Sequence, residues 1–225
     1  AQVAQLQELI TQANILQLNT DEAQALIDDE NSTYTEMLIA IDALENLIDE
    51  NVEMINIVKN SDFEGTDVSC FYSRENCTED NYIIPATIVD GVGVDGSCGI
   101  VITSIDNPSA AWDKQFFLRL PQTLPAGTKY RLSFDYKASQ EARVTMETHA
   151  ELGDYINGFD DTQFATEWQH YEREGKITEE QSPADHLMLT IAFTLAHTET
   201  ATTYYLDNIV FEVDQFHNMS EDPET

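Results

Sequence analysis

Two aromatic side chains lie in polar stretches of the sequence, where a buried aromatic residue would be unusual. Trp112 follows a polar turn, and Tyr155 lies in a polar segment that contains glycines. An aromatic ring that remains exposed can stack on the apolar face of a ligand, while amide and imidazole groups bind its polar rim. Gln115, three residues after Trp112, and His149, shortly before Tyr155, are groups of this kind. The pattern favours non-covalent recognition of a ligand that has both apolar and polar surfaces.

Several of these residues also have an ordinary structural interpretation. Trp112 could cover the rim of the core, Gln115 could be an exposed strand residue, and His149 could be a solvated side chain at a strand end. Trp168 is different, because it lies in a predicted strand close to Phe164 and Tyr171. We therefore expect Trp168 in the core.

The elements that must position these side chains are predicted to be β-strands. Nine short segments have the apolar alternation or short apolar blocks of strands, with turn clusters between them. They are residues 55–60, 86–89, 99–103, 115–120, 130–138, 143–149, 168–177, 187–195 and 203–213. Segments 71–76 and 151–159 are more polar, and we expect them to be loops. Many short strands without intervening helices predict a sandwich or a barrel.

Residues 1–54 instead have the apolar spacing of helices. Thr20 is expected to cap a short helix, and Thr33 with Glu36 fits a capping box before a longer helix. The apolar face of that longer helix extends to Ile55, and the segment contains no Lys or Arg. Helices this short are marginal in isolation. We expect them to pack on each other, on the following domain, or on a neighbour outside this chain.

The charge of the chain excludes several classes of partner. The sequence has 42 acidic against 10 basic residues, a formal net charge of −32. Such a surface repels nucleic acids and anionic membranes. No segment approaches the roughly 20 apolar residues of a membrane span, so we expect no membrane insertion. The start of the chain also lacks the basic region of a signal peptide. Solubility outside the cell explains the acidic excess, as would calcium capture or a salty habitat.

Three cysteines, Cys70, Cys77 and Cys98, leave the disulfide pairing open. Cys70 and Cys77 flank a polar segment that a disulfide could staple. Cys98 begins an apolar strand and could be a small buried hydrophobe. The sequence has no CxxC motif and no histidine with zinc-site spacing, so we expect no metal bound through sulfur.

Five blocks of the sequence carry a recognisable pattern: residues 60–65, 112–115, 125–134, 166–171 and 204–209. They resemble the blocks of jelly-roll carbohydrate-binding modules of families 4, 9 and 22, found in bacterial secreted polysaccharide-degrading systems. The resemblance implies a mainly β fold, with a β-sandwich jelly roll over residues 55–214. An acidic segment of two or three helices, residues 1–54, precedes it, and a polar tail, residues 215–225, follows it.

The resemblance also implies a concave face or cleft that holds a polysaccharide. In that interpretation Trp112 and Tyr155 stack on sugar rings, while Gln115 and His149 bind the hydroxyl groups. Related modules that bind along the cleft often carry polar or charged side chains on the penultimate strand, but segment 187–194 offers only threonines as polar groups.

A structural Ca²⁺ is implied at Glu64 and Asp207. In the resembling modules, the acid of the first block and the aspartate before the final strand meet where the first and last strands pair. Calcium takes six to eight oxygen ligands, several of them backbone carbonyls, so two carboxylates in a tight turn suit it. The alternative is that both carboxylates only cap or hydrogen-bond the backbone.

The sequence predicts a protein that is not an enzyme, because it lacks a nucleophile elbow, a phosphate-binding glycine loop and a zinc-protease motif. Two carboxylates can hydrolyse a glycosidic bond, but any pairing among so many acids is arbitrary. We expect binding of a β-linked glycan such as xylan or β-glucan. Such binding would target an associated catalytic domain or a bacterial cell surface to the glycan, at an extracellular or cell-surface location. The alternative is a structural or adhesive module that has no glycan site.

Overall fold

The computed structural model describes residues 1–76, 82–182 and 189–217. The chain divides into two compact units, Ala1–Glu53 and Met54–Thr225. The first unit is helical and the second is built from two β-sheets, so the predicted mainly β fold with a small helical N-terminal segment is confirmed.

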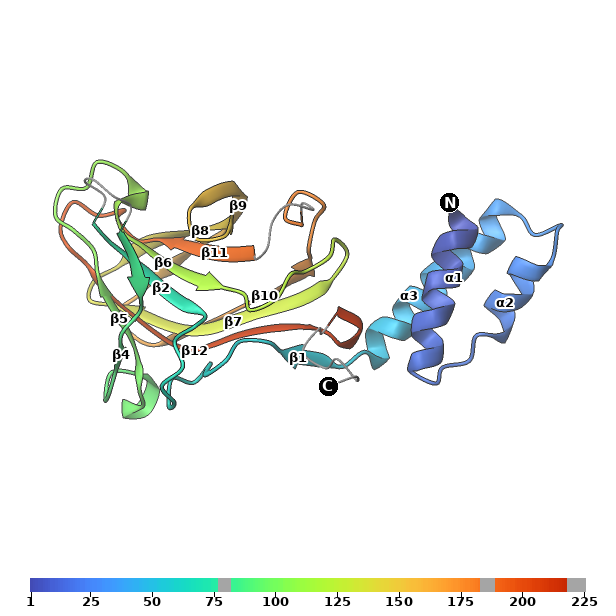
Figure 1. Ribbon diagram of the computed structural model, residues 1–225, viewed down its shortest axis with the longest axis horizontal. Coiled ribbons are helices and arrows are strands. Elements are labelled where there is room, and N and C mark those ends of the chain that lie inside the picture. The colour runs from blue at the N-terminus through green and yellow to red at the C-terminus, as the bar shows by residue number, and fades with distance from the viewer. Residues whose placement is uncertain (77–81, 183–188, 218–225) are drawn as a thin grey trace. The chain divides into compact units, whose positions relative to one another are not determined.

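The helical unit contains α1 (Gln2–Ile15), α2 (Asp21–Asp28) and α3 (Tyr34–Asn51), as Figure 1 shows. Its core is formed by apolar side chains at helical spacing: Leu6, Ile10, Ala13, Ala23, Ile41, Leu44 and Ile48. Within the described ranges, no helix has both the length and the apolar character needed to cross a membrane.

The predicted capping box at the start of α3 is confirmed. The Thr33 hydroxyl accepts a hydrogen bond from the Glu36 amide at 3.3 Å, and the Glu36 carboxylate accepts one from the Thr33 amide at 2.8 Å. Thr20 precedes α2, but its hydroxyl does not cap the helix. The Asp21 amide instead donates to the Asn19 side chain at 2.9 Å.

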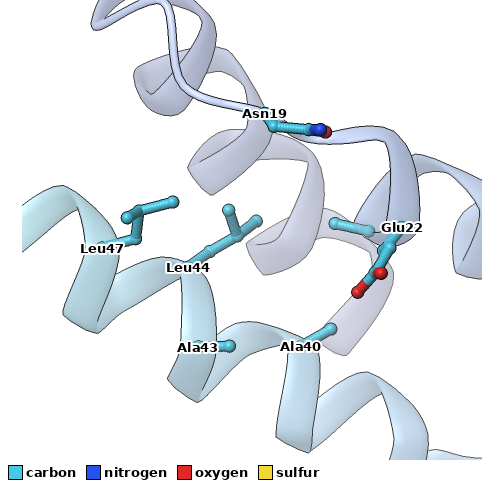
Figure 2. A pocket seen from close by; sticks show the side chains of 7 residues that line it. Asn19, Glu22, Ala40, Ala43, Leu44 and Leu47 are labelled. Atoms are coloured by element: carbon cyan, nitrogen blue, oxygen red, sulfur yellow. The ribbon is translucent and has the colours of Figure 1, made fainter.

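Helix α3 does not extend to Ile55. It ends at Asn51, because Val52 has an extended backbone, and Ile55 lies in the first strand. Figure 2 shows a hollow of about 280 Å³ in the helical unit, where small side chains of α3 face α2. Helix α2 buries only Ala23, so it contributes little to the core of this unit.

The β unit consists of two antiparallel sheets (Figure 1). The first sheet has the order β10-β7-β12-β5-β4, and β1 also pairs with β12. Its strands are β1 (Met54–Asn56), β4 (Ile88–Val89), β5 (Gly99–Thr103), β7 (Lys129–Ala138), β10 (Gln169–Lys176) and β12 (Thr203–Asp214).

The second sheet has the order β3-β2-β6-β11-β8-β9. Its strands are β2 (Phe71–Asn76), β3 (Tyr82–Pro85), β6 (Gln115–Arg119), β8 (Ala142–Ala150), β9 (Asp154–Phe164) and β11 (Leu189–Thr194). Three short 3₁₀ helices, η1 (Val94–Gly96), η2 (Ala111–Asp113) and η3 (Gln215–His217), lie in the connections or after the last strand.

Aromatic side chains from both sheets fill the core between them. Strand β7 alternates between buried and half-buried residues, as expected for a strand with one face on a core. Its Phe134 contacts Phe193 of the opposite sheet, with ring centroids 5.2 Å apart. Tyr204 is fully buried, and its hydroxyl donates to the Leu195 carbonyl at 2.7 Å. Burial raises the pKa of Tyr204 to about 12.

The structure corrects two of the predicted loops. Residues 71–76 form β2, and residues 154–159 lie in the eleven-residue strand β9. Strand β9 lies at the edge of the second sheet and pairs with β8 alone. An edge strand can expose polar and glycine residues that would be unsuitable in a central strand. The composition of β9 is therefore that of a loop, and β9 could not be predicted as a strand from it.

The thiols of Cys70 and Cys98 are free, so these two residues do not pair with each other. Cys70 is buried, and this burial raises the pKa of its thiol. The predicted staple between Cys70 and Cys77 involves a residue outside the described ranges. In the predicted polar tail, residues 215–217 form η3 and residues 218–225 also lie outside these ranges.

Candidate functional site

A groove of about 470 Å³ lies on the face of the second sheet that points away from the core. We call it the Trp112 groove. It is lined by Arg74, Trp112, Gln115, Glu147, His149, Gly153 and Tyr155. All four ligand-binding residues predicted from the sequence therefore line one groove, although they come from η2, β6, β8 and β9.

Strand register explains why these side chains meet. Arg74 on β2 lies opposite Gln115 on β6, and Gln115 lies opposite Thr194 on β11. Farther along the same strands, Thr190 on β11 lies opposite His149 on β8. Side chains two residues apart on a strand share one face, so these polar residues lie on one face of the sheet. Arg74, Gln115 and His149 among them line the groove, and we call them its floor.

Phe117 forms the centre of this face. It is fully buried, but it does not belong to the core cluster between the sheets. The Arg74 guanidinium lies 5.7 Å from the centroid of its ring, and the His149 ring packs edge-on with centroids 6.0 Å apart. Phe117 thus supports a cation and an imidazole at fixed positions on the floor.

Two exposed aromatic side chains rise above this floor. Trp112 is 58% exposed and Tyr155 is 63% exposed. Tyr155 lies opposite His149 in the pairing of β9 with β8, and the two rings meet edge-on at 6.0 Å. A register shift between Thr148 and His149 interrupts this pairing beside the groove.

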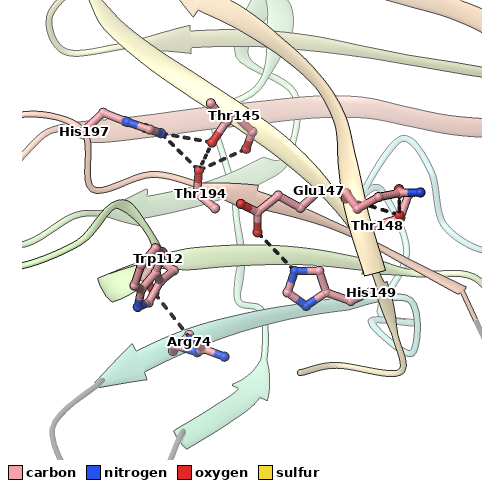
Figure 3. Close-up of polar contacts among 9 residues, drawn as sticks. Arg74, Trp112, Thr145, Glu147, Thr148, His149, Thr194 and His197 are labelled. Atoms are coloured by element: carbon pink, nitrogen blue, oxygen red, sulfur yellow. Dashed lines mark hydrogen bonds and ion pairs between the residues drawn. The ribbon is translucent and has the colours of Figure 1, made fainter. Parts of the chain in front are cut away.

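The turn that carries Trp112 is fixed by the buried carboxylate of Asp113. One oxygen of Asp113 accepts hydrogen bonds from the Ser109 amide at 2.6 Å, the Ser109 hydroxyl at 2.8 Å and the Ala110 amide at 2.9 Å. Burial alone would raise the pKa of Asp113, but these hydrogen bonds lower it below its ordinary value. The Trp112 carbonyl also accepts a hydrogen bond from Arg74 at 3.4 Å (Figure 3). The exposed ring therefore has a well-anchored backbone.

Several polar atoms on this face are buried and have no hydrogen-bond partner among the described residues. They are Arg74 Nε, Gln115 Oε1, His149 Nδ1 and Thr190 Oγ1. Buried polar groups are normally paired, and leaving one unpaired costs about 1–3 kcal/mol. The fold therefore leaves several polar groups on this face without a hydrogen-bond partner.

Charged and hydroxyl groups complete the polar surface. His149 Nε2 lies 3.2 Å from the Glu147 carboxylate, and His197 Nε2 lies 3.1 Å from the hydroxyls of both Thr145 and Thr194 (Figure 3). Burial, assisted by the nearby charge of Arg143, lowers the pKa of His197. A neutral imidazole can accept a hydrogen bond from these hydroxyls.

Three residues of this face were not among the site residues predicted from the sequence. Arg74 lies in a segment that we expected to be a loop, and Thr190 was noted only as one of the threonines of segment 187–194. Glu147 was detectable, because it lies two residues before His149 on a predicted strand and must share its face.

Glu64 and Asp207 both hold the loop formed by residues 93–98. Asp207 accepts hydrogen bonds from the Val94 amide and the Ser97 hydroxyl, both at 2.8 Å. Glu64 accepts one from the Cys98 amide at 2.8 Å. Gly93 lies so close that a Cβ there would be 2.6 Å from the Asp207 carboxylate.

These contacts are those of capping carboxylates. Within the described ranges, no group of three or more His, Cys, Asp or Glu side chains could hold a metal ion. A Ca²⁺ held by Glu64 and Asp207 would need backbone carbonyls for most of its ligands. Calcium binding here stays a prediction.

The prediction that Trp168 belongs to the core is wrong. Trp168 is half-buried and lies just before β10, on the outer face of the first sheet. The Lys137 ammonium lies 4.8 Å from the centroid of its ring. Its neighbours in the sequence, Phe164 and Tyr171, point to the core, but they belong to other strand positions.

Comparisons with known proteins agree with this fold. A family of carbohydrate binding domains, CBM_4_9, matches residues 55–197. No curated protein matches the chain. A solved CBM4 structure is 25% identical, with 57% of this chain and 77% of that chain covered and a TM-score of 0.43.

Two further solved structures have lower identity. The CBM22-1 xylan-binding domain from Paenibacillus barcinonensis is 15% identical, with 72% of this chain and 95% of that chain covered and a TM-score of 0.48. An arabinose-bound α-L-arabinofuranosidase is 11% identical, with 73% of this chain and 27% of that chain covered and a TM-score of 0.51. The family match spans well over half of the sequence, and the chain therefore belongs to the CBM_4_9 family of carbohydrate-binding domains.

Proposed function

We propose that the Trp112 groove binds a segment of a β-linked polysaccharide and does not cleave it. One observation carries the proposal: two exposed aromatic rings, Trp112 and Tyr155, line a groove whose floor contains unpaired buried donors and acceptors. A sugar ring has an apolar C–H face for an aromatic ring and a rim of hydroxyls for polar groups. Because the side chains of the floor are buried and supported, little conformational entropy is lost on binding.

The charge of the protein supports a neutral glycan. A chain with a formal net charge of −32 repels polyuronates and sulfated polysaccharides. In the groove, the cation of Arg74 is accompanied by the carboxylate of Glu147. Xylan and β-glucan are neutral or nearly neutral β-linked chains, and the β-linkage is inferred from the family resemblance.

The lining also supports binding without hydrolysis. Most glycoside hydrolases use a pair of carboxyl groups on either side of the scissile bond. Among the described lining residues of the Trp112 groove, Glu147 is the only carboxylate. We infer a targeting role, in which the module holds an associated enzyme or a bacterial cell surface against the glycan, outside the cell.

Affinity electrophoresis against a panel of soluble polysaccharides tests this proposal. The panel contains xylan, mixed-linkage β-glucan and galactan as neutral chains, with polygalacturonate and a sulfated galactan as acidic ones. We expect retardation by at least one neutral β-linked chain and no release of reducing ends during overnight incubation. Retardation by none of the neutral chains, or release of reducing ends by the purified protein, would contradict the proposal.

A further inference from the structure

We propose that the first sheet carries a second sugar-binding groove, on the face of the sandwich opposite the Trp112 groove. We call it the Trp168 groove. Its volume is about 520 Å³, and its walls include Trp168, Lys137, Tyr205 and the loop of residues 91–96. This inference goes beyond the proposed function, because it concerns another face of the module and stands on separate residues.

Strand register forms a row of side chains across the end of this sheet. Lys137 on β7 lies opposite Tyr205 on β12. Their neighbours Tyr136 and Tyr204 point into the core, so Lys137 and Tyr205 point outward. Trp168 directly precedes β10, which pairs with β7 on the other side. Two adjacent strands and the residue that precedes a third thus carry a cation and two aromatic rings.

The two rings hold the lysine in place. The Lys137 ammonium lies 4.8 Å from the centroid of the Trp168 ring and 5.0 Å from that of Tyr205. No hydrogen bond or ion pair of this ammonium is present within the described ranges. The cation–π contacts therefore position Lys137 while its three N–H donors stay available to a ligand.

The opposite wall is a preformed loop that presents its backbone. The Asp207 carboxylate fixes this loop through the Val94 amide and the Ser97 hydroxyl. Gly91 and Gly96 adopt positive φ values of 76° and 84°, and a Cβ at either position would meet nothing within 4 Å. The space in front of the loop is therefore open to a ligand, and no side chain of these two residues fills it.

The chemistry of the lining selects a neutral sugar. Lys137 supplies donors, the exposed carboxylate of Asp95 supplies acceptors, and hydroxyls of Ser139 and Thr166 can do both. Trp168 adds an apolar surface for C–H groups. An acidic sugar would pair with Lys137, but it would meet Asp95 and the negative charge of the whole chain. Donors, acceptors and aromatic surface together match a neutral sugar.

Grooves on opposite faces would make the module bivalent. One molecule could then hold two glycan chains, or two segments of one chain, and gain avidity without any new contact.

The two tryptophans of the chain lie in different grooves, so each one reports on a separate site. In the Trp112→Phe variant, Trp168 is the sole tryptophan emitter, and in Trp168→Phe it is Trp112. Each variant is titrated with xylohexaose, cellohexaose and β-1,4-galactotriose as neutral sugars, and with a galacturonic acid oligosaccharide as an acidic one. Lys137→Met, combined with Trp112→Phe, removes the central cation. Lys176→Met in the same background is the matched control, because Lys176 is exposed at the far end of β10.

We expect a saturable change in Trp168 emission with at least one neutral oligosaccharide, abolished by Lys137→Met and retained with Lys176→Met. A response of Trp112 in Trp168→Phe, without any response of Trp168 in Trp112→Phe, overturns the second groove and leaves the proposed function intact. If no sugar changes the emission of either tryptophan, both proposals are overturned. A Trp168 response to uronic acid oligosaccharides alone overturns the neutral ligand class.

Discussion

Arg74 combines two roles on the floor of the Trp112 groove. Its guanidinium contacts the Phe117 ring and the Trp112 carbonyl, while its Nε has no partner among the described residues. Replacing it with methionine keeps the aliphatic stem but removes the donors. We expect Arg74→Met to weaken glycan binding about tenfold, or ~1.4 kcal/mol, measured by calorimetric titration. Arg119→Met is the control, because Arg119 pairs with Glu151 outside the groove lining. An equal loss in both variants would contradict the assignment.

We predict that His197 makes the free energy of unfolding depend on pH. Burial and Arg143 lower its pKa below the ordinary value of 6.5, so the unfolded chain binds this proton more tightly than the folded protein. The stability that the neutral imidazole contributes is therefore present above about pH 6.5 and is lost as the pH falls toward the lowered pKa. We expect the urea midpoint to fall between pH 7.5 and pH 5.5, and the fall to be smaller in His197→Gln. The same fall in this variant would assign the effect to other groups.

At the scale of the element, the turn before β6 fixes the position of the Trp112 backbone. Asp113→Ala removes three hydrogen bonds from the turn. We expect a loss of about 1–3 kcal/mol in the free energy of unfolding and weaker glycan binding, because the ring loses its anchor. Asp161→Ala removes an exposed ion pair with Arg143 and should cost less than about 1 kcal/mol. Urea unfolding measures both; an Asp113→Ala protein as stable as Asp161→Ala would contradict this role.

Strands with clear apolar alternation were predictable from the sequence. The predicted segment 99–103 has the bounds of β5, and β7 and β12 differ from their predictions by one residue at one end. Strands β2 and β9 were not predictable, because their outward residues are polar and serve the groove or the sheet edge. Arg74 was not predicted for the same reason, because a polar strand residue that lines a groove resembles a loop residue in the sequence. The prediction for Trp168 was wrong for the opposite reason. Its apolar neighbours in the sequence indicated burial, although Trp168 lies outside the strand.

At the scale of the whole molecule, segments far apart in the sequence pair in the β unit, and β1 pairs with the end of β12, where Met54 lies opposite Asp214. The predicted Ca²⁺ would bind elsewhere, at Glu64 and Asp207 beside the loop of residues 93–98. We expect added Ca²⁺ to raise the melting temperature and a chelator to lower it. The rise should vanish in Glu64→Gln and Asp207→Asn, which keep one acceptor oxygen for the loop. A melting temperature that does not change with chelator would refute calcium binding and leave capping as the role of both residues.

Calorimetric titration of the retarding glycan into the native protein and Trp112→Ala tests the central claim most directly. Tyr34→Ala serves as the control, because Tyr34 is as exposed (61%) but lies in the helical unit. An aromatic stacking contact is worth about 0.5–1.5 kcal/mol beyond the area that it buries, so we predict at least fivefold weaker binding by Trp112→Ala at an unchanged melting temperature. Affinity equal to that of the native protein and Tyr34→Ala would contradict the claim that this groove holds the glycan.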